Sequence, residues 1–300
     1  MRLLTHKHDG RLRLAALIGE QVVDLATMWA ARTGETAPPD VRGLIEAGPA
    51  LWARLAEALA AGDVASFARP LAGLELAAPI QNPSKVIAIG LNYWDHVREQ
   101  GGEPPKRPLV FAKFPTAVTG PRDEIVWDPA LTNKVDWEAE LAVVIGRTAR
   151  RVPAERAYDY VFGYTVANDV SARDLQFGDG QWVRGKSLDS FCPLGPWIVT
   201  RDEIPDPHAL TIRCAVNDEL VQDSTTAELI FGIPALIEFL SHAFTLLPGD
   251  VILTGTPDGV GHFRNPPRYL ADGDLVTAEV GGIGALSNRC RVETRTSGSA

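Results

Sequence analysis

The pattern of hydrophobic and polar positions divides the chain into two parts, of which the first covers about 75 residues. Short apolar runs in this part are separated by turn residues such as Gly10 and Gly19, which is typical of paired strands. The pattern predicts strands at residues 1–4, 12–17 and 21–25. Because helices are expected to follow these strands, we predict a small α+β cap domain over residues 1–75.

The helices of the cap are predicted from their first turns. Asp40 has the short acceptor side chain of an N-cap, and Pro49 suits the first turn of a further helix over residues 50–60. Leucines at four-residue spacing give that helix one apolar face. Residues 67–79 are expected to form a connector to the rest of the chain.

From residue 85 onward, short apolar runs are bounded by Gly, Pro, Asp and Asn, which predicts a series of strands. These strands are expected at residues 86–89, 109–112, 141–145, 162–168, 197–199, 210–216, 251–254, 275–280 and 288–293. One helix is expected over residues 234–245, beginning at Pro234. Many strands with few helices predict a β-rich, mixed α+β domain over residues 76–293. The small polar residues 294–300 are predicted to form a disordered tail.

Composition and charge limit the class of protein. With 45% hydrophobic and 22% charged residues among 300, the chain is expected to bury a sizeable core without disulfides. The net charge of −9 argues against nucleic acid as the main partner, because phosphate binding relies on clustered Lys and Arg. It is compatible with a small anionic substrate bound at a local cation.

Targeting and cysteine patterns predict a cytoplasmic protein without membrane association. No apolar run has the length of a signal peptide's core or of a membrane span. Cys192, Cys214 and Cys290 are widely spaced and form no metal-ligand motif. We expect them to be buried free thiols in a reducing compartment.

Three carboxylates are the strongest candidates for chemistry. Glu138 and Glu140 stand two residues apart at the start of an apolar strand, so their side chains point to the same face. Two like charges side by side repel unless a cation lies between them, and Mg²⁺ prefers oxygen ligands. Asp169 leaves another strand where a loop begins and supplies a third ligand. The alternative is an edge strand on which Glu138 and Glu140 face solvent.

Five segments follow one another in order between residues 85 and 292. They are GLNYWDHVRE from Gly90, DWEAE from Asp136, NDVSARD from Asn168, GKSLDSFCPLGP from Gly185 and TGTPDGVG from Thr254. This series resembles the fumarylacetoacetate hydrolase family. The resemblance implies a mixed β-roll with few helices, usually as a homodimer. It also implies a divalent metal, commonly Mg²⁺ and sometimes Mn²⁺ or Ca²⁺, at the positions of Glu138, Glu140 and Asp169. Larger hydrolases of the family use a fourth aspartate, but Asn92 stands near that position here.

The resemblance also implies an acid–base pair and an oxyanion group. His96 and Glu99 lie three residues apart in a stretch that can form a helical turn, so the carboxylate can orient the imidazole. Such a pair can activate water beside a metal. Lys186 lies in a Gly-containing turn and is expected to stabilise an enolate or oxyanion. Without the resemblance, His96 would be taken for a surface histidine and Lys186 for a solvated lysine.

Arg173, Gln176 and Thr256 are predicted to bind the substrate. Arg173 suits a planar carboxylate, although it could instead pair structurally with Asp169 or Asp174. Thr256 directly follows a strand, and the alternative is that it only shapes a glycine-bent turn. Residues 99–108, with two glycines and three prolines, are expected to be a lid, because the corresponding segment of the family closes over the substrate.

Together these parts predict a metal-dependent hydrolysis of a C–C bond in an acylpyruvate or related 2,4-diketo acid. The metal and Lys186 would stabilise the pyruvate enolate, and His96 with Glu99 would activate the attacking water. Other members of the family start from the same metal-bound 2-oxo acid. Decarboxylation of oxaloacetate-like acids and isomerisation or hydration of 2-oxo dienoic acids are therefore the alternatives. Outside enzymes, the alternative is a non-catalytic protein that binds small acids.

Overall fold

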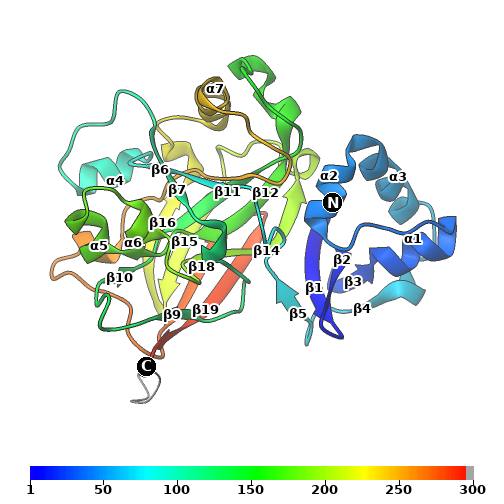
Figure 1. Ribbon diagram of the computed structural model, residues 1–300, viewed down its shortest axis with the longest axis horizontal. Helices are drawn as coiled ribbons and strands as arrows, with labels where there is room; N and C mark the ends of the chain where they lie inside the picture. The colour runs from blue at the N-terminus through cyan, green and yellow to red at the C-terminus, as the bar shows by residue number, and fades with distance from the viewer. Residues whose placement is uncertain (295–300) are drawn as a thin grey trace, which may run out of the picture.

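The N-terminal part of the chain, blue to cyan in Figure 1, combines short strands with three α-helices. Its strands are β1 (Arg2–His8), β2 (Arg11–Ile18), β3 (Gln21–Asp24), β4 (Ala68–Pro70) and β5 (Glu75–Ala77). Its helices are α1 (Leu25–Thr33), α2 (Val41–Ala47) and α3 (Pro49–Ala60), with the 3-10 turn η1 (Ala65–Phe67). Asp40 caps α2 as predicted, since its carboxylate accepts the N–H of Gly43 at 2.7 Å.

The segment predicted as a connector, residues 67–79, is more ordered than expected. Its strands β4 and β5 pair with β3 and β1. Each has only three residues, which is too short for an alternating pattern to stand out in the sequence.

The rest of the described chain is dominated by strands. They are β6 (Val86–Gly90), β7 (Leu109–Lys113), β8 (Val118–Thr119), β9 (Ile125–Trp127), β10 (Val135–Asp136), β11 (Ala139–Ile145), β12 (Val161–Asn168), β13 (Ser171–Ala172), β14 (Cys192–Thr200), β15 (Thr211–Val216), β16 (Glu219–Thr225), β17 (Val251–Leu253), β18 (Leu275–Val280) and β19 (Gly284–Val292). The helices are α4 (Trp94–Glu99), α5 (Arg173–Gly178), α6 (Val183–Lys186) and α7 (Ile233–Ala243). The 3-10 turns are η2 (Pro115–Ala117), η3 (Ala154–Tyr160), η4 (Arg201–Glu203), η5 (Thr226–Glu228) and η6 (Gly261–Phe263).

The computed structural model describes residues 1–294, and in this range every predicted strand overlaps an observed one. The strand β16 was not predicted, because most of its residues are polar and it is stabilised by pairing with β15. Of the tail predicted over residues 294–300, residues 295–300 lie outside the described residues. The β-rich, mixed fold class is confirmed.

Two sheets organise the molecule. The larger has twelve strands, ordered β4-β3-β2-β1-β14-β12-β11-β17-β6-β7 with β5 and β8 attached at its side, and the smaller has the order β16-β15-β18-β19-β9. Strand β1 pairs with β14, so the N-terminal strands extend the main sheet rather than form a separate one. The boundary between a cap over residues 1–75 and a catalytic domain over residues 76–293 stays a prediction.

Strand β11 lies at the centre of the large sheet, between β12 and β17, and all of its residues are buried. Leu141, Val143 and Ile145 belong to the core shared with the smaller sheet. Ala142 and Val144 point the other way, into the core that includes the N-terminal helices. Because both faces of β11 are covered, a charged side chain on it has no direct access to bulk water.

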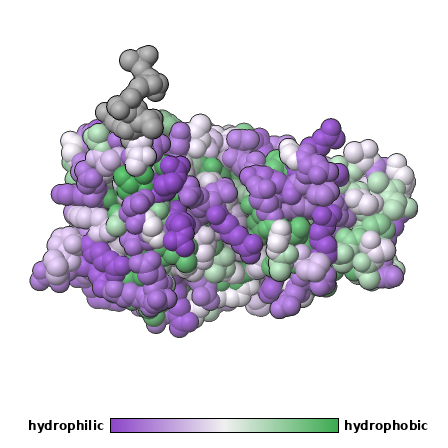
Figure 2. Space-filling model, turned by 90° about the horizontal axis from the view of Figure 1, so that it is seen from below, coloured by the Kyte–Doolittle hydropathy of each residue, from purple (hydrophilic) through white to green (hydrophobic). Residues whose placement is uncertain are grey.

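The face in Figure 2 is mostly hydrophilic, with hydrophobic side chains in separate patches. Cys192, Cys214 and Cys290 are buried and free, as predicted. None of the helices in residues 1–294 is both long enough and apolar enough to cross a membrane.

Candidate active site

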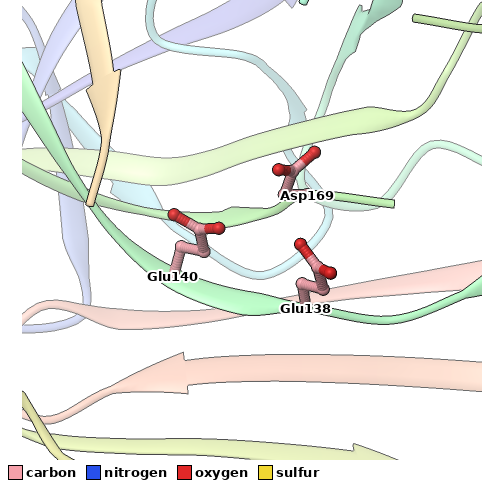
Figure 3. Close-up of side chains that lie close together, drawn as sticks. All are labelled: Glu138, Glu140 and Asp169. Carbon is pink, nitrogen blue, oxygen red and sulfur yellow. The ribbon is translucent and has the colours of Figure 1, made fainter. Parts of the chain in front are cut away.

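Glu138, Glu140 and Asp169 converge at the ends of two neighbouring strands (Figure 3). Glu140 lies in β11, Glu138 directly precedes this strand, and Asp169 directly follows β12. The register that pairs Ala139 with Asn168 brings Asp169 beside Glu138, whose carbonyl accepts the Asp169 N–H at 2.9 Å. One carboxylate oxygen from each residue lies within 4.8 Å of the others.

The solvent-facing alternative for the two glutamates is wrong. Strand β11 is central rather than at an edge, and Glu138 and Glu140 are only 6% and 1% exposed. Their side chains point to the same side, as the two-residue spacing predicted (Figure 3). Three buried carboxylates so close together require compensation by positive charge.

Glu138 receives this compensation from Lys186 and Arg173. The Lys186 ammonium lies 2.6 Å from Oε2 of Glu138, and Nη2 of Arg173 lies 2.7 Å from Oε1. Burial alone would raise the pKa of the Glu138 carboxyl, but these two cations outweigh burial and lower the pKa to about 2. Glu138 is therefore ionised at neutral pH.

Asp169 is held between two lysines. Nζ of Lys113 lies 2.5 Å from its Oδ1, and Nζ of Lys186 lies 3.1 Å from its Oδ2. Lys186 is 2% exposed and so is not the solvated lysine of the alternative interpretation. Sequence analysis missed Lys113. The available signal was a lysine at the end of an otherwise apolar strand, β7.

Glu140 differs from the other two carboxylates, because no cationic side chain of the described residues contacts it. Its Oε2 accepts the backbone N–H of Gly255 at 2.6 Å. Burial and the neighbouring charges of Asp169 and Glu138 raise the pKa of the Glu140 carboxyl well above its usual range. A carboxylate in this position would be stabilised by a cation placed between the three groups. The oxygen donor set fits a hard divalent metal such as Mg²⁺ or Mn²⁺.

His96 and Glu99 form the predicted pair on the short helix α4. Nδ1 of His96 lies 2.9 Å from Oε2 of Glu99, whose other oxygen accepts the N–H of Gly259 at 3.0 Å. His96 is only 5% exposed, so it is not a surface histidine. Its second ring nitrogen, Nε2, lies 2.8 Å from Nε2 of Gln100, a contact that sequence analysis did not anticipate.

Arg173 pairs with carboxylates other than those expected. Its Nε donates to Asp136 at 2.8 Å and its Nη2 meets Glu138, so the suggested pairing with Asp169 or Asp174 is wrong. Its Nη1 donates to Oε1 of Gln176 at 3.0 Å. Arg173 and Gln176 both line the cavity described below, but the Arg173 guanidinium is already engaged on two sides.

Thr256 and Asn92 hold the loop after β17. The Thr256 hydroxyl donates to the carbonyl of Ala139 at 2.9 Å and accepts from Gln222 at the same distance. The Asn92 amide donates to the carbonyl of Thr254 at 2.8 Å and to that of Phe231 at 3.1 Å. Asn92 is therefore a structural link rather than a counterpart of a fourth metal ligand. Thr256 keeps a place on the cavity wall.

A cavity of about 260 Å³ opens beside the carboxylates and contains most of the predicted site residues. Its polar walls are formed by His96, Gln100, Glu138, Glu140, Arg173, Gln176, Lys186 and Thr256. Its apolar walls are formed by Ile89, Leu91, Phe111, Phe177, Trp182 and Phe263, with Gly90 between them. Such a volume suits a small acid. That residues 99–108 close over it as a lid stays a prediction.

Comparisons with known proteins support the predicted resemblance. A family model described as fumarylacetoacetate (FAA) hydrolase C-terminal matches residues 85–291. Oxaloacetate tautomerase Fahd2a, mitochondrial, of Rattus norvegicus is 44% identical over 285 residues, which are 95% of this chain and 88% of the rat protein. Oxaloacetate tautomerase fahd2, mitochondrial, of Xenopus laevis is 53% identical over 217 residues, which are 72% of this chain and 68% of the frog protein.

Solved structures give the same result. The fumarylacetoacetate hydrolase of Exiguobacterium antarcticum superimposes with a TM-score of 0.84 at 36% identity, over 98% of this chain and 100% of that one. A maleylpyruvate hydrolase of Sphingobium sp. SYK-6, solved with manganese(II) and pyruvate, gives a TM-score of 0.80 at 33% identity with the same coverage.

Two expectations need correction after these comparisons. The predicted cytoplasmic location is contradicted, because the rat and frog relatives are both described as mitochondrial. That expectation rested on composition and on the absence of an apolar targeting run, which are poor guides to an organelle address. The relatives named as tautomerases also favour the oxaloacetate alternative over acylpyruvate hydrolysis.

Proposed function

This chain belongs to the fumarylacetoacetate hydrolase family of metal-dependent enzymes, and we propose that it interconverts the keto and enol forms of a 2-oxo dicarboxylic acid such as oxaloacetate. The observation that carries the proposal is a single small cavity that is lined by Glu138 and Glu140 of the buried carboxylate triad and by an imidazole fixed by a carboxylate. The triad provides a metal site for the 2-oxo acid end, and the imidazole provides a base.

Glu138, Glu140 and Asp169 would hold the metal, which we propose to be Mg²⁺. Mn²⁺ is supported as an alternative by the manganese in the Sphingobium hydrolase, and Ca²⁺ also accepts oxygen ligands. When bound, the divalent ion would act as a Lewis acid toward the 2-oxo group and make the adjacent C–H bond more acidic.

The protein's own groups would move and balance the proton. Glu99 keeps the hydrogen on Nδ1 of His96, which leaves Nε2 as the basic atom. His96 Nε2 takes a proton from C3 of the keto acid and passes it through solvent to the oxygen at C2, which gives the enol, and the reverse transfer returns the proton to C3. The Lys186 ammonium stabilises the negative charge that develops on the 2-oxo oxygen. Tautomerisation needs no further reactant, so protons and electrons balance within the substrate.

Arg173, Gln176 and Thr256 are proposed to orient the acid rather than to react. Gln176 has a more available donor than Arg173. Its carbonyl oxygen accepts from Arg173, while its NH₂ group has no partner in the described residues. The substrate is proposed to be a small anion and the protein a homodimer, as is usual in the family. Neither a nucleic acid nor a membrane has a part in this proposal.

Hydrolysis of acylpyruvates is the second candidate, supported by the similarity to the maleylpyruvate hydrolase and by the His96–Glu99 pair. It requires a water molecule at Nε2 of His96. Both reactions need the lone pair of Nε2, so the preference rests on the relatives, and those named as oxaloacetate tautomerases make tautomerisation the better supported reaction. Decarboxylation of oxaloacetate uses the same metal site and needs no activated water.

The test is to follow enol oxaloacetate by its ultraviolet absorbance with the purified protein, in Mg²⁺ and in EDTA. We expect Mg²⁺-dependent decay well above the uncatalysed rate, lost in His96→Ala. His242→Ala, on the exposed face of α7, is the matched control and should retain the activity. Pyruvate release from acylpyruvates without enol decay would establish hydrolysis instead. Oxalate binding with neither activity would establish a non-catalytic binding protein.

A further inference from the structure

Both ring nitrogens of His96 are occupied in this structure. Nδ1 faces the Glu99 carboxylate at 2.9 Å, and Nε2 faces the side-chain nitrogen of Gln100 at 2.8 Å. A carboxylate can only accept, so Nδ1 carries the hydrogen. Nε2 of the neutral ring is then an acceptor, and the Gln100 amide donates to it. The lone pair that the proposed reaction requires is therefore covered.

A bound substrate must break this contact, and the Gln100 side chain is placed so that it can turn from His96 toward the substrate. The backbone of Gln100 ends α4, where its N–H donates to the carbonyl of His96 at 3.2 Å. Gly101 and Gly102 donate to carbonyls of the same helix. The main chain is thus held in place, while three rotatable side-chain bonds let the amide swing inside the cavity that Gln100 lines.

The other positive groups in the cavity are already committed. Lys186 contacts Glu138 and Asp169, and Arg173 contacts Asp136 and Glu138. Among the lining residues of the described chain, no cation is left for a second carboxylate at the far end of a dicarboxylic acid. The NH₂ groups of Gln100 and Gln176 are the side-chain amide donors on the cavity wall.

We infer that Gln100 is a positioning and specificity-determining residue, whose amide moves from His96 to the far carboxylate of a bound 2-oxo dicarboxylic acid. A carboxylate is a stronger acceptor than a neutral imidazole, so the exchange is favourable. It uncovers Nε2 of His96 only when the second carboxylate is present. The same movement of Gln100 then recognises the far carboxylate and frees Nε2 of His96 to act as the base. This inference rests on the proposed tautomerisation.

The experiment compares oxaloacetate with 2-oxobutanoate, which lacks the second carboxylate. Exchange of the C3 hydrogens for deuterium is followed by NMR for both acids, with Mg²⁺ present and the uncatalysed rate subtracted. For the wild type we expect a strong preference for oxaloacetate in kcat/KM. Gln100→Leu should lose roughly 10- to 100-fold with oxaloacetate, which is the usual effect of losing a hydrogen bond to a charged group. With 2-oxobutanoate the kcat/KM of this variant should not fall and should rise, because the base is no longer covered.

Gln100→Glu tests the same point with an isosteric side chain. Its negative charge repels the far carboxylate, so the loss with oxaloacetate should exceed that in Gln100→Leu. Gln21→Leu, at an exposed position of β3, is the matched control and should keep the wild-type ratio of the two substrates. Thermal unfolding with and without Mg²⁺ establishes that each variant is folded and binds metal.

The outcomes separate the two proposals. If the wild type accelerates exchange in neither acid, the proposed tautomerisation is wrong. If the wild type is active but kcat/KM falls equally for the two substrates in both Gln100 variants, Gln100 has only a structural role and the inference is overturned. A change in the substrate ratio confined to the Gln100 variants supports it, since a general loosening of α4 would affect both acids alike.

Discussion

The ammonium group of Lys113 lies 2.5 Å from Oδ1 of Asp169, and both side chains are almost completely buried. Lys113 also donates to the carbonyl of Val170 at 3.1 Å. The second oxygen of Asp169, Oδ2, lies 3.1 Å from the Lys186 ammonium, so the carboxylate is fixed at both oxygens. Lys113 thus orients a proposed metal ligand from outside the cavity, where it does not itself meet the substrate.

Replacing Lys113 by Met is expected to destabilise the protein by about 3 kcal/mol without metal, because it removes the nearer of the two cations that compensate the buried Asp169 charge. A divalent ion at the triad would supply that charge. The loss measured by urea unfolding should therefore be smaller in saturating Mg²⁺ than in EDTA. Lys7→Met removes an exposed pair with Glu75 and should cost below about 1 kcal/mol in either buffer. Equal losses in both buffers for Lys113→Met would argue against a metal beside Asp169.

Glu140→Gln should separate metal binding from folding. The glutamine oxygen can still accept the N–H of Gly255, but the charge that repels Glu138 and Asp169 is gone. At a pH above the raised pKa of Glu140, where the wild-type carboxyl is ionised, the metal-free variant is therefore expected to unfold at a higher temperature than the metal-free wild type. Its Mg²⁺ affinity should fall by at least about 100-fold, since a charged ligand is lost. A less stable apo variant that keeps the full Mg²⁺-induced shift would contradict this assignment.

The pH dependence of the folding stability of the metal-free protein follows from Glu140. The pKa of Glu140 is raised above 4.5 in the folded state, so the folded protein binds this proton more tightly than the unfolded chain. The stabilisation is complete below pH 4.5 and is lost as the pH rises through the raised pKa. Glu138 acts at lower pH. The pKa of its carboxyl is about 2 in the folded state, so the stability that its ionised form contributes is lost as the pH falls from 4.5 toward 2.

Chemical unfolding at a series of pH values in EDTA should therefore show stability declining above pH 4.5. Saturating Mg²⁺ should remove this decline, because metal binding expels the proton from Glu140. Calorimetry in buffers of different ionisation enthalpy should then detect proton release on Mg²⁺ binding. Glu140→Gln provides the control, in which the decline is absent without metal. A wild-type profile that does not differ between EDTA and Mg²⁺ would be inconsistent with this account.

The proximity of the proposed metal ligands could be predicted from sequence because their geometry is local. A two-residue spacing on a strand places Glu138 and Glu140 on one face whatever the strand pairs with. Asp169 was identified by its position at a strand end. His96 and Glu99 were similarly predictable, since a single helical turn brings residues three apart together.

The missed contacts depend on pairing between distant segments. Lys113 meets a residue 56 positions away, and Asp136 meets Arg173 across 37 positions. Neither contact leaves a periodic pattern in the sequence. Gln100 is only four residues from His96, but its contact involves side-chain conformations that spacing does not determine. Burial decided the remaining alternatives, because it distinguishes a solvated Lys186 from one held between carboxylates.

Gly90 is expected to control the shape of the cavity wall. A Cβ atom there would lie 2.6 Å from Cζ3 of Trp182 and 3.2 Å from Cδ2 of Leu109, so the indole must move. The indole packs edge-on against Phe111 at 5.3 Å. Gly90→Ala should therefore raise KM by roughly tenfold while kcat changes little, because His96 and the carboxylates are untouched. In a Trp182→Ala background the clash is absent, and adding Gly90→Ala should change KM much less. Additive effects would show that Trp182 does not mediate the change.

Asn92 allows a direct test of how many protein ligands the metal has. Its amide donates to the carbonyls of Thr254 and Phe231 and accepts the Phe231 N–H at 2.8 Å. In Asn92→Asp, the carboxylate would have no hydrogen to donate to the carbonyls of Thr254 and Phe231, in a position that is 1% exposed. We expect a loss of about 1–3 kcal/mol in the free energy of unfolding by urea. Because the side chain is turned toward these backbone groups, Mg²⁺ affinity from calorimetry should not increase. Tighter Mg²⁺ binding by the variant would instead indicate that this position can supply a fourth carboxylate ligand.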